Sequence, residues 1–301
     1  MNYIDNIAFA LLLFFGIGFF VKNIKKLSRN INLGKNIDRT DNSGARWKNM
    51  AMIALGQSKM IKRPVAGILH VIVYVGFIII NIEVLEIIID GLFGTHRALS
   101  VLGSFYHFLI GFFEILAFLV LVSVTVFWIR RMVLRIPRFW NKEMKGFPKN
   151  DALYILYFEM VLMSLFLIMN SADVPFQQVN SGNPISQFLV PFFENFNAST
   201  LFFIERTAWW IHIAGILVFL NYLYYSKHLH ILLAFPNTYF ANLKPKGQLT
   251  NLEAVTNEVK MMMDPNIDPF AAAPEGAEAS VPEKFGASDV TDLNWVQLMN
   301  A

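Results

Sequence analysis

The sequence predicts an all-α integral membrane protein with five transmembrane helices, and three observations lead to this fold class. Hydrophobic residues make up 55% of the 301 positions, whereas charged residues make up only 16%. The apolar residues gather in long runs, and a hydrocarbon core about 30 Å thick requires roughly 20 of them in one helix. Lysine and arginine are concentrated in two of the connections between these runs, as is typical of loops on one side of a membrane.

The apolar runs predict the individual spans. In chain order they cover residues 7–21, 64–89, 98–129, 152–168 and 207–234. A weaker run over residues 185–204 contains Pro191, Glu194 and two asparagines. Polar residues are costly in the hydrocarbon region. We therefore expect this run to lie at the interface or to re-enter the membrane.

The basic residues predict the orientation. Of the 25 lysines and arginines, residues 22–63 carry eleven and residues 130–149 carry seven. The opposite connections carry Arg97 and Arg206 alone. Since basic loops stay in the cytoplasm, the N-terminus is predicted outside and the C-terminal tail inside. The net charge of +3 is then a consequence of topology, and no nucleic-acid partner is expected.

The composition changes after the last span. Residues 1–236 are predicted to form the membrane domain, and residues 237–301, rich in Pro, Ala, Gly and Glu, a flexible cytoplasmic linker. Ser288 or Thr291 is expected to cap a short helix over residues 292–301. Cysteine is absent, so this chain carries no disulfide and no iron–sulfur cluster of its own.

Five of the six histidines lie inside the predicted spans or at their ends, and only His96 falls in a short loop. His212 and His230 are eighteen positions apart, which in one continuous helix is five turns, or about 27 Å along one face. They are too far apart to share a metal ion. His228 is rotated by roughly 160° from His212.

Partners for these histidines are expected at matching depths. His70 would pair with His230 near the cytoplasmic ends of their spans, and His107 with His212 near the outer ends. Two axial imidazoles for each site are what a low-spin b-type haem requires. We therefore predict a haem-binding bundle with two b haems, whose iron ligands are His70, His230, His107 and His212.

Small residues one turn from each of these histidines would leave room for a flat macrocycle. They are Ala66, Gly67, Gly103, Gly111, Ala208, Gly215 and Ala234, whereas His228 has bulky neighbours. The alternatives are a cofactor-free membrane anchor for a cytoplasmic partner, in which the histidines only form hydrogen bonds, and a mono-haem version. Carboxylates within the spans, such as Glu83, Glu86 and Glu114, would either relay protons or bond a neighbouring helix.

Several stretches resemble known membrane cytochromes. The interval from His212 to His230, with Lys227 three residues before the second histidine, resembles the last span of the respiratory nitrate reductase gamma subunit family. This likeness covers about residues 1–240. ALGQSKMIKRPVAGILHVIVYVGF, residues 54–77, resembles the start of the membrane domain in heterodisulfide-reductase-related iron–sulfur oxidoreductases. DVTDLNWVQLMNA, residues 289–301, resembles the linker before the first cluster-binding cysteines of those proteins.

The resemblance implies a cytochrome b domain of a bacterial cytoplasmic (inner) membrane. It would pass electrons between the quinone pool and iron–sulfur clusters on a cytoplasmic partner subunit or on a further C-terminal domain. The chain would thus be a component of an oxidoreductase, and relatives that accept electrons from electron-transfer flavoprotein favour quinone reduction. The nitrate reductase family takes a second ligand about three turns after the first. Here that position is Ile80, followed by Asn81, so His107 replaces it and the mono-haem version stays open.

Overall fold

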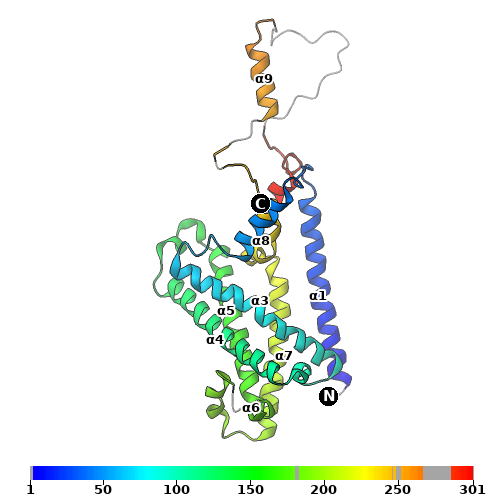
Figure 1. The fold of residues 1–301 in the computed structure, drawn as a ribbon, viewed down its shortest axis with the longest axis vertical. Helices are drawn as coiled ribbons and strands as arrows, with labels where there is room; N and C mark the ends of the chain where they lie inside the picture. Colours follow the sequence, from blue (N-terminus) through cyan, green and yellow to red (C-terminus); the bar gives the residue numbers. More distant parts are fainter. Residues whose placement is uncertain (1–2, 180–182, 246, 249–251, 267–285, 301) are drawn as a thin grey trace. The chain divides into compact units, whose positions relative to one another are not determined.

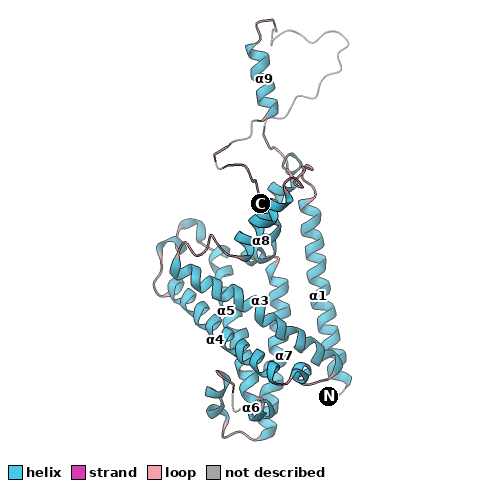
Figure 2. Ribbon diagram, viewed as in Figure 1, coloured by secondary structure: helices cyan, strands magenta, loops and turns pink. Residues whose placement is uncertain are grey.

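The computed structural model describes residues 3–179, 183–245, 247–248, 252–266 and 286–300. Regular structure within these ranges is helical, and no strand occurs among them (Figure 2). The chain divides into two compact units, one made of residues 1–25 and 55–232 and the other of residues 26–54 and 233–301. Each unit joins segments that are distant in the sequence.

Within the part of the chain that the structure describes, five helices are long and apolar enough to cross a membrane, in agreement with the predicted number. They are α1 (Tyr3–Ile31), α3 (Pro64–Phe93), α4 (Ser104–Met132), α5 (Phe147–Ala172) and α7 (Ala198–Leu223). Two helices differ slightly from their predicted bounds. The helix predicted over 64–89 continues to Phe93, and the first residues of the span predicted over 98–129, Ala98–Leu102, form the separate 3-10 helix η2.

The long helices of the first unit pack in sequence order, α3 on α4, α4 on α5 and α5 on α7 (Figure 1). Helix α1 packs through Phe9, which is fully buried and lies 5.2 Å from Trp209 of α7 between ring centroids. Other apolar side chains remain exposed, such as Phe14 of α1, with 71% of its surface accessible. Exposed apolar side chains on long helices are what a hydrocarbon surrounding requires.

Local sequence sets the helix ends. Pro64 begins α3, where its missing N–H leaves no hydrogen bond unmade, and Gly94 ends it with a φ of 71°. Asn197 caps α7, because its side chain accepts a hydrogen bond from the Thr200 N–H at 2.8 Å. The weak run at 185–204 is divided between two 3-10 helices, η5 (Ser186–Phe188) and η6 (Val190–Phe193), and the first turns of α7.

The fifth helix differs most from the prediction of one span over residues 207–234. It begins nine residues earlier, at Ala198, and ends at Leu223. The chain then forms the 3-10 helix η7 (Lys227–Leu229) and helix α8 (His230–Tyr239). Ser226 accepts a hydrogen bond from the His228 N–H, and buried Asp151 of α5 accepts one from the Lys227 N–H. These two acceptors stabilise the interruption, so His212 and His230 do not share one continuous helix.

The second unit contains α2 (Ser43–Met50), the continuing π-helix η1 (Ala51–Leu55), α9 (Glu253–Met263), η8 (Val290–Asp292) and α10 (Trp295–Asn300). Residues 267–285 of the predicted linker lie outside the described residues. The last residues pair with the segment after α1: the Lys35 N–H donates to the Leu293 oxygen at 2.8 Å, and the Trp295 indole donates to the Ile37 oxygen at 3.0 Å. The expected short helix therefore begins at Trp295, and Asp289 caps the preceding turn.

Arg46 organises the rest of this unit. Only 1% of its surface is exposed, and it donates to the backbone oxygens of Asp41, Tyr239 and Ala241 and to the Asp41 carboxylate. Every nitrogen of the guanidinium thus has an acceptor, as a buried arginine requires.

Candidate functional site

Two of the predicted haem ligands lie side by side. The rings of His70, on α3, and His230, at the start of α8, have centroids 6.5 Å apart and are inclined by 36°. The Nδ1 atom of His230 lies 2.7 Å from the Lys227 backbone oxygen. A histidine held in this way presents its other nitrogen, Nε2, to a ligand. The Nδ1 atom of His70 is buried and has no hydrogen-bond partner among the described residues.

This spacing suits a metal ion between two imidazoles. Imidazole nitrogens bind metal ions at about 2.0–2.1 Å, which together with the half-width of each ring gives a centroid separation of roughly 6 Å. The observed 6.5 Å is close to that value. The separation of the His70 and His230 rings is therefore compatible with one metal ion held between the two imidazoles.

A third histidine joins this pair. The His228 ring lies 5.5 Å from the His230 ring, nearly perpendicular to it, and its Nε2 lies 3.4 Å from the Glu159 carboxylate. The sequence set His228 apart, because its neighbours are bulky and its direction in a continuous helix differs from that of His212. The interruption after Leu223 changes that direction. Three histidines and one carboxylate therefore meet at this end of the helices.

The other predicted ligands occupy different surroundings. His212 is 3% exposed, its ring lies 6.3 Å from that of Phe166, and its Nδ1 has no hydrogen-bond partner among the described residues. His107 lies in the first turn of α4, with its ring centroid 5.9 Å from that of Tyr106. His212 is fourteen residues into α7, about 21 Å along its axis. The sequence argument that His107 and His212 lie at the same depth assumed that the fifth span begins at Thr207. Because α7 begins at Ala198, that argument no longer supports the pairing.

Protein atoms fill the space beside two of the small residues, Gly67 and Gly215, whereas a Cβ atom added to Gly103 would meet nothing within 4 Å. A Cβ atom added to Gly67 would lie 2.3 Å from the Met60 backbone oxygen, and one added to Gly215 would lie 2.8 Å from a methyl group of Leu162. These glycines thus allow close packing, which is their common role in membrane helices. Leu162 therefore occupies the space beside Gly215, one turn from His212.

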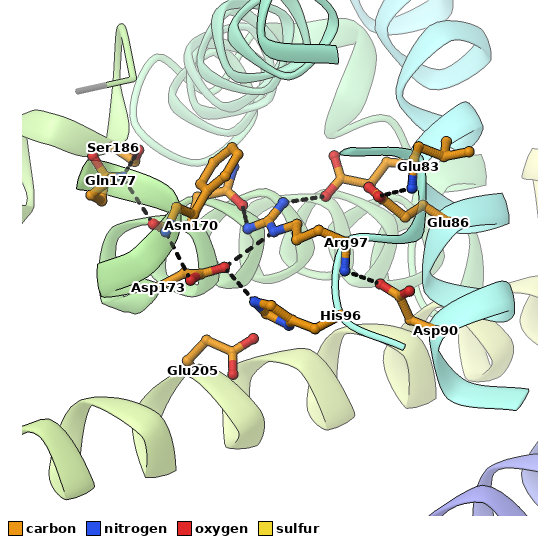
Figure 3. Close-up of polar contacts among 12 residues, drawn as sticks. Glu83, Glu86, Asp90, His96, Arg97, Asn170, Asp173, Gln177, Ser186 and Glu205 are labelled. Atoms are coloured by element: carbon orange, nitrogen blue, oxygen red, sulfur yellow. Dashed lines mark hydrogen bonds and ion pairs between the residues drawn. The ribbon is translucent and has the colours of Figure 1, made fainter. Parts of the chain in front are cut away.

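The opposite ends of the helices hold a buried polar cluster centred on Arg97, which lies in the loop between α3 and η2 (Figure 3). Its guanidinium donates to Asp173 at 3.1 Å and to Asn170 at 2.8 Å, and lies 3.8 Å from Glu83. We call the following residues the Arg97 cluster: Glu83, Glu86, Asp90, His96, Arg97, Glu114, Asn170, Asp173 and Glu205. Helices α3, α4, α5 and α7 all contribute to it.

Three carboxylates of the cluster hold loops in place. Asp90 accepts from the backbone N–H groups of Arg97 and Ala98, at 2.8 and 3.0 Å. Glu86 accepts from the Leu99 N–H and the Tyr106 hydroxyl, each at 2.9 Å. Glu114 accepts from the N–H groups of residues 185 and 186 at 3.0 Å. Of the carboxylates that the sequence singled out, Glu86 and Glu114 thus form hydrogen bonds that join helices to loops.

The remaining acidic groups are less completely bonded. Glu83 is 3% exposed, and its Oε2 atom has no hydrogen-bond partner among the described residues. Glu205 contacts Arg206, its neighbour in the chain. The His96 Nε2 lies 3.1 Å from Asp173, while 47% of the His96 side chain is exposed. Ligand atoms of His96, Asp173 and Glu205 lie within 4.8 Å of one another.

Charged groups in the loops of this cluster stabilise each other's ionised forms. Burial alone would lower the pKa of Arg97, but Tyr106, Glu83 and Asp173 raise it above its ordinary value, so the guanidinium stays charged. Burial alone would raise the pKa of Asp173, but the hydrogen bond to His96 and the charge of Arg97 hold it below its usual range. Asp173 is therefore a carboxylate that joins a buried cation to a solvent-accessible histidine.

A small cavity opens within the cluster. Its lining includes Glu83, His96, Arg97, Glu205 and Trp209. Trp209 and His212 are three positions apart on α7, so the cavity lies about one helical turn from His212. The sequence placed His96 and Arg97 in an ordinary loop and did not single out Asp173 or Glu205. The only available signal was that charged residues flank the ends of several apolar runs.

The described residues thus combine five helices of membrane-spanning length, a facing histidine pair and a buried ionic cavity at the opposite helix ends, which indicates a multi-pass membrane protein. Over 297 residues, 97% of this chain, it is 29% identical to the probable iron-sulfur-binding oxidoreductase FadF of Bacillus subtilis (strain 168), covering 37% of that protein. It is 23% identical over 282 residues, 88% of the chain, to the EtfAB:quinone oxidoreductase of Syntrophomonas wolfei, covering 34% of that protein.

The chain thus spans about a third of the length of these curated relatives. No protein-family model matches the chain. No solved structure matches it.

Proposed function

We propose that this chain is the membrane electron-transfer component of a quinone-linked oxidoreductase, holding b haem between the quinone pool and iron–sulfur clusters. The observation that carries the proposal is the His70–His230 pair, whose rings face each other at 6.5 Å. The names of the two relatives support it, since one is an iron–sulfur-binding oxidoreductase and the other reacts with quinone.

His70 and His230 would supply the axial ligands of the first haem. When bound, the haem would supply one-electron transfer. The contact between His230 Nδ1 and the Lys227 oxygen keeps that ring oriented with Nε2 available. His107 and His212 would hold the second haem, and the buried Nδ1 atom of His212 has no hydrogen-bond partner among the described residues.

The mono-haem version is the second candidate, and a specific contact favours it. The Leu162 side chain occupies the space beside Gly215, one turn from His212. In that version only the His70–His230 pair holds a haem.

The Arg97 cluster is proposed to serve the quinone. Reduction of a quinone takes up two electrons and two protons, so its site needs hydrogen-bond donors and a route for protons. Arg97 supplies a buried donor, Glu83 an oxygen with no hydrogen-bond partner among the described residues, and His96 an imidazole whose side chain is 47% exposed. The cavity lies about one turn from His212, which would shorten the path to the second haem.

The basic loops are proposed to face the cytoplasm of a bacterial cell, which orients the two ends. The His70–His230 pair would then lie toward an iron–sulfur domain or subunit inside, and the Arg97 cluster toward the outer face. Quinone reduction, with electrons delivered from iron–sulfur clusters, is the direction that the name of the second relative favours.

The test is a reduced-minus-oxidised absorbance spectrum of the protein, purified from cells supplied with haem, with haem measured per chain. A sharp b-type α band with about two haems per chain supports the di-haem version, and about one supports the mono-haem version. Reoxidation of the reduced protein by a soluble quinone analogue would link the haem to quinone. Absence of haem contradicts the proposal and leaves a membrane anchor.

A further inference from the structure

The connection between α4 and α5 is strongly basic. Residues 130–149 contain seven lysines and arginines and a single acidic residue, Glu143. The segment includes two 3-10 helices, η3 (Pro137–Phe139) and η4 (Lys142–Met144). The Trp140 indole donates to the Arg131 backbone oxygen at 3.1 Å, which folds the connection back against the last turn of α4.

Arg131 is the buried cation of this region. Only 9% of its surface is exposed, and its guanidinium carbon lies 4.6 Å from the centre of the Phe139 ring. Its Nη1 atom is buried and has no hydrogen-bond partner among the described residues. Arg46, which is 1% exposed, has an acceptor for every nitrogen. An unsatisfied buried donor is costly, so Arg131 is prepared for an acceptor supplied by a ligand.

Cations outnumber the carboxylates around Arg131. Arg138 packs on the same Phe139 ring at 4.7 Å, and the positive charges of Arg138 and Lys227 both repel that of Arg131. Asp151 is the carboxylate that acts on both Arg131 and Lys227. Its oxygens already accept from the Tyr222 hydroxyl at 2.7 Å and the Lys227 N–H at 3.2 Å. Arg131 and Lys227 therefore share one engaged carboxylate while Arg138 adds a further positive charge beside Arg131, which favours binding of an anion.

The surroundings of this cationic group are apolar and exposed. Val133 and Leu134, directly after α4, are 61% and 64% exposed, and Phe147 at the start of α5 is 58% exposed. Trp140 is 38% exposed, and the Lys149 ammonium lies 3.5 Å from the centre of its ring. A free inorganic anion gains nothing from such neighbours. A ligand with a charged head and a hydrocarbon chain contacts both kinds of surface.

We propose that Arg131, Arg138 and Lys227 form a binding site for the phosphate of an anionic membrane phospholipid. Arg131 and Arg138 donate hydrogen bonds to the phosphate oxygens, as guanidinium groups commonly do, and Lys227 adds a point charge. The acyl chains lie along the exposed apolar residues that follow α4. The site concerns only the first unit and does not depend on haem binding.

The test measures lipid retention by native mass spectrometry and thermal stability of the purified protein in a neutral detergent. Phosphatidylglycerol, phosphatidylcholine and inorganic phosphate are added separately. The variants are Arg131→Gln and Arg138→Gln, and the matched control is Lys142→Gln, which removes the same charge from an exposed position of the same connection. Since a hydrogen bond to a charged group contributes about 1.5–3 kcal/mol, each variant should bind phosphatidylglycerol roughly tenfold more weakly or worse.

The expected result is that phosphatidylglycerol stabilises the wild-type protein and Lys142→Gln, and that phosphatidylcholine does not. Arg131→Gln should lose the effect, and if that variant fails to fold, Arg138→Gln decides. An equal loss in Lys142→Gln would show a diffuse charge effect and overturn the proposal. Equal stabilisation by inorganic phosphate would overturn the assignment to a lipid. So would equal retention of phosphatidylcholine.

Discussion

Removing the Arg97 guanidinium should destabilise the first unit strongly. In the Arg97→Gln variant, Asp173 and Glu83 remain buried, with 3% or less of their surface exposed, and lose the cation that faces them. Removing one partner of a buried ion pair typically costs about 3–5 kcal/mol, because the other charge stays uncompensated. We therefore expect the free energy of unfolding to fall by that amount.

The assay is equilibrium unfolding in mixed micelles with increasing dodecyl sulphate, followed by circular dichroism. The control is Arg63→Gln, an exposed arginine that precedes α3, for which a change within about 0.5 kcal/mol is expected. Addition of Asp173→Asn to Arg97→Gln should restore part of the loss, since the uncompensated charge is then removed. A loss below about 1 kcal/mol in Arg97→Gln would refute the view that this ion pair stabilises the cluster.

Three further outcomes follow from the structure. Because the pKa of Asp173 is held below its usual range, its stabilising contribution is complete above about pH 3.9 and is lost as the pH falls through the lower folded value. Thermal unfolding of the wild-type protein across acidic pH should show this loss of stability, and the Asp173→Asn variant should not show it. Equal acid sensitivity of the two proteins would contradict the assignment of the loss to Asp173. Gly34→Ala should speed hydrogen exchange of the Trp295 amide, since the new Cβ would lie 2.6 Å from that nitrogen, whereas Gly44→Ala, with open space, should not. Leu162→Ala should lower the free energy of unfolding of the haem-free protein by roughly 2–5 kcal/mol. A loss below about 1 kcal/mol would show that Leu162 does not fill the space beside Gly215.

Hydropathy predicted the number of long helices, because every spanning helix must satisfy its own backbone and present apolar side chains. The ends and interruptions were less predictable. The break after Leu223 depends on Asp151, a residue more than seventy positions earlier, whose carboxylate accepts from the Lys227 N–H. A pattern read along one helix contains no sign of such a distant acceptor.

The candidate site, like the helix ends, was predicted only in part from the sequence. His70 and His230 were paired from their positions near the same membrane face, and the structure brings their rings together. The grouping of His96, Arg97 and Asp173 was not predicted, because these residues come from loops whose approach is set by tertiary contacts with Glu86, Asp90 and Glu114. Of the glycines that suggested room for a macrocycle, Gly67 instead admits the backbone of Met60 and Gly215 the side chain of Leu162.

The most direct test of the account is the haem content of four purified proteins: wild type, His70→Ala, His230→Ala and the control His228→Ala. His228 lies at the same end of the helices, with its ring 5.5 Å from that of His230. The account predicts that His70→Ala and His230→Ala each lose one haem relative to wild type, whereas His228→Ala retains the full content. Loss of the haem in His228→Ala with retention in His230→Ala, or full content in all four, would contradict the assignment of the His70–His230 pair.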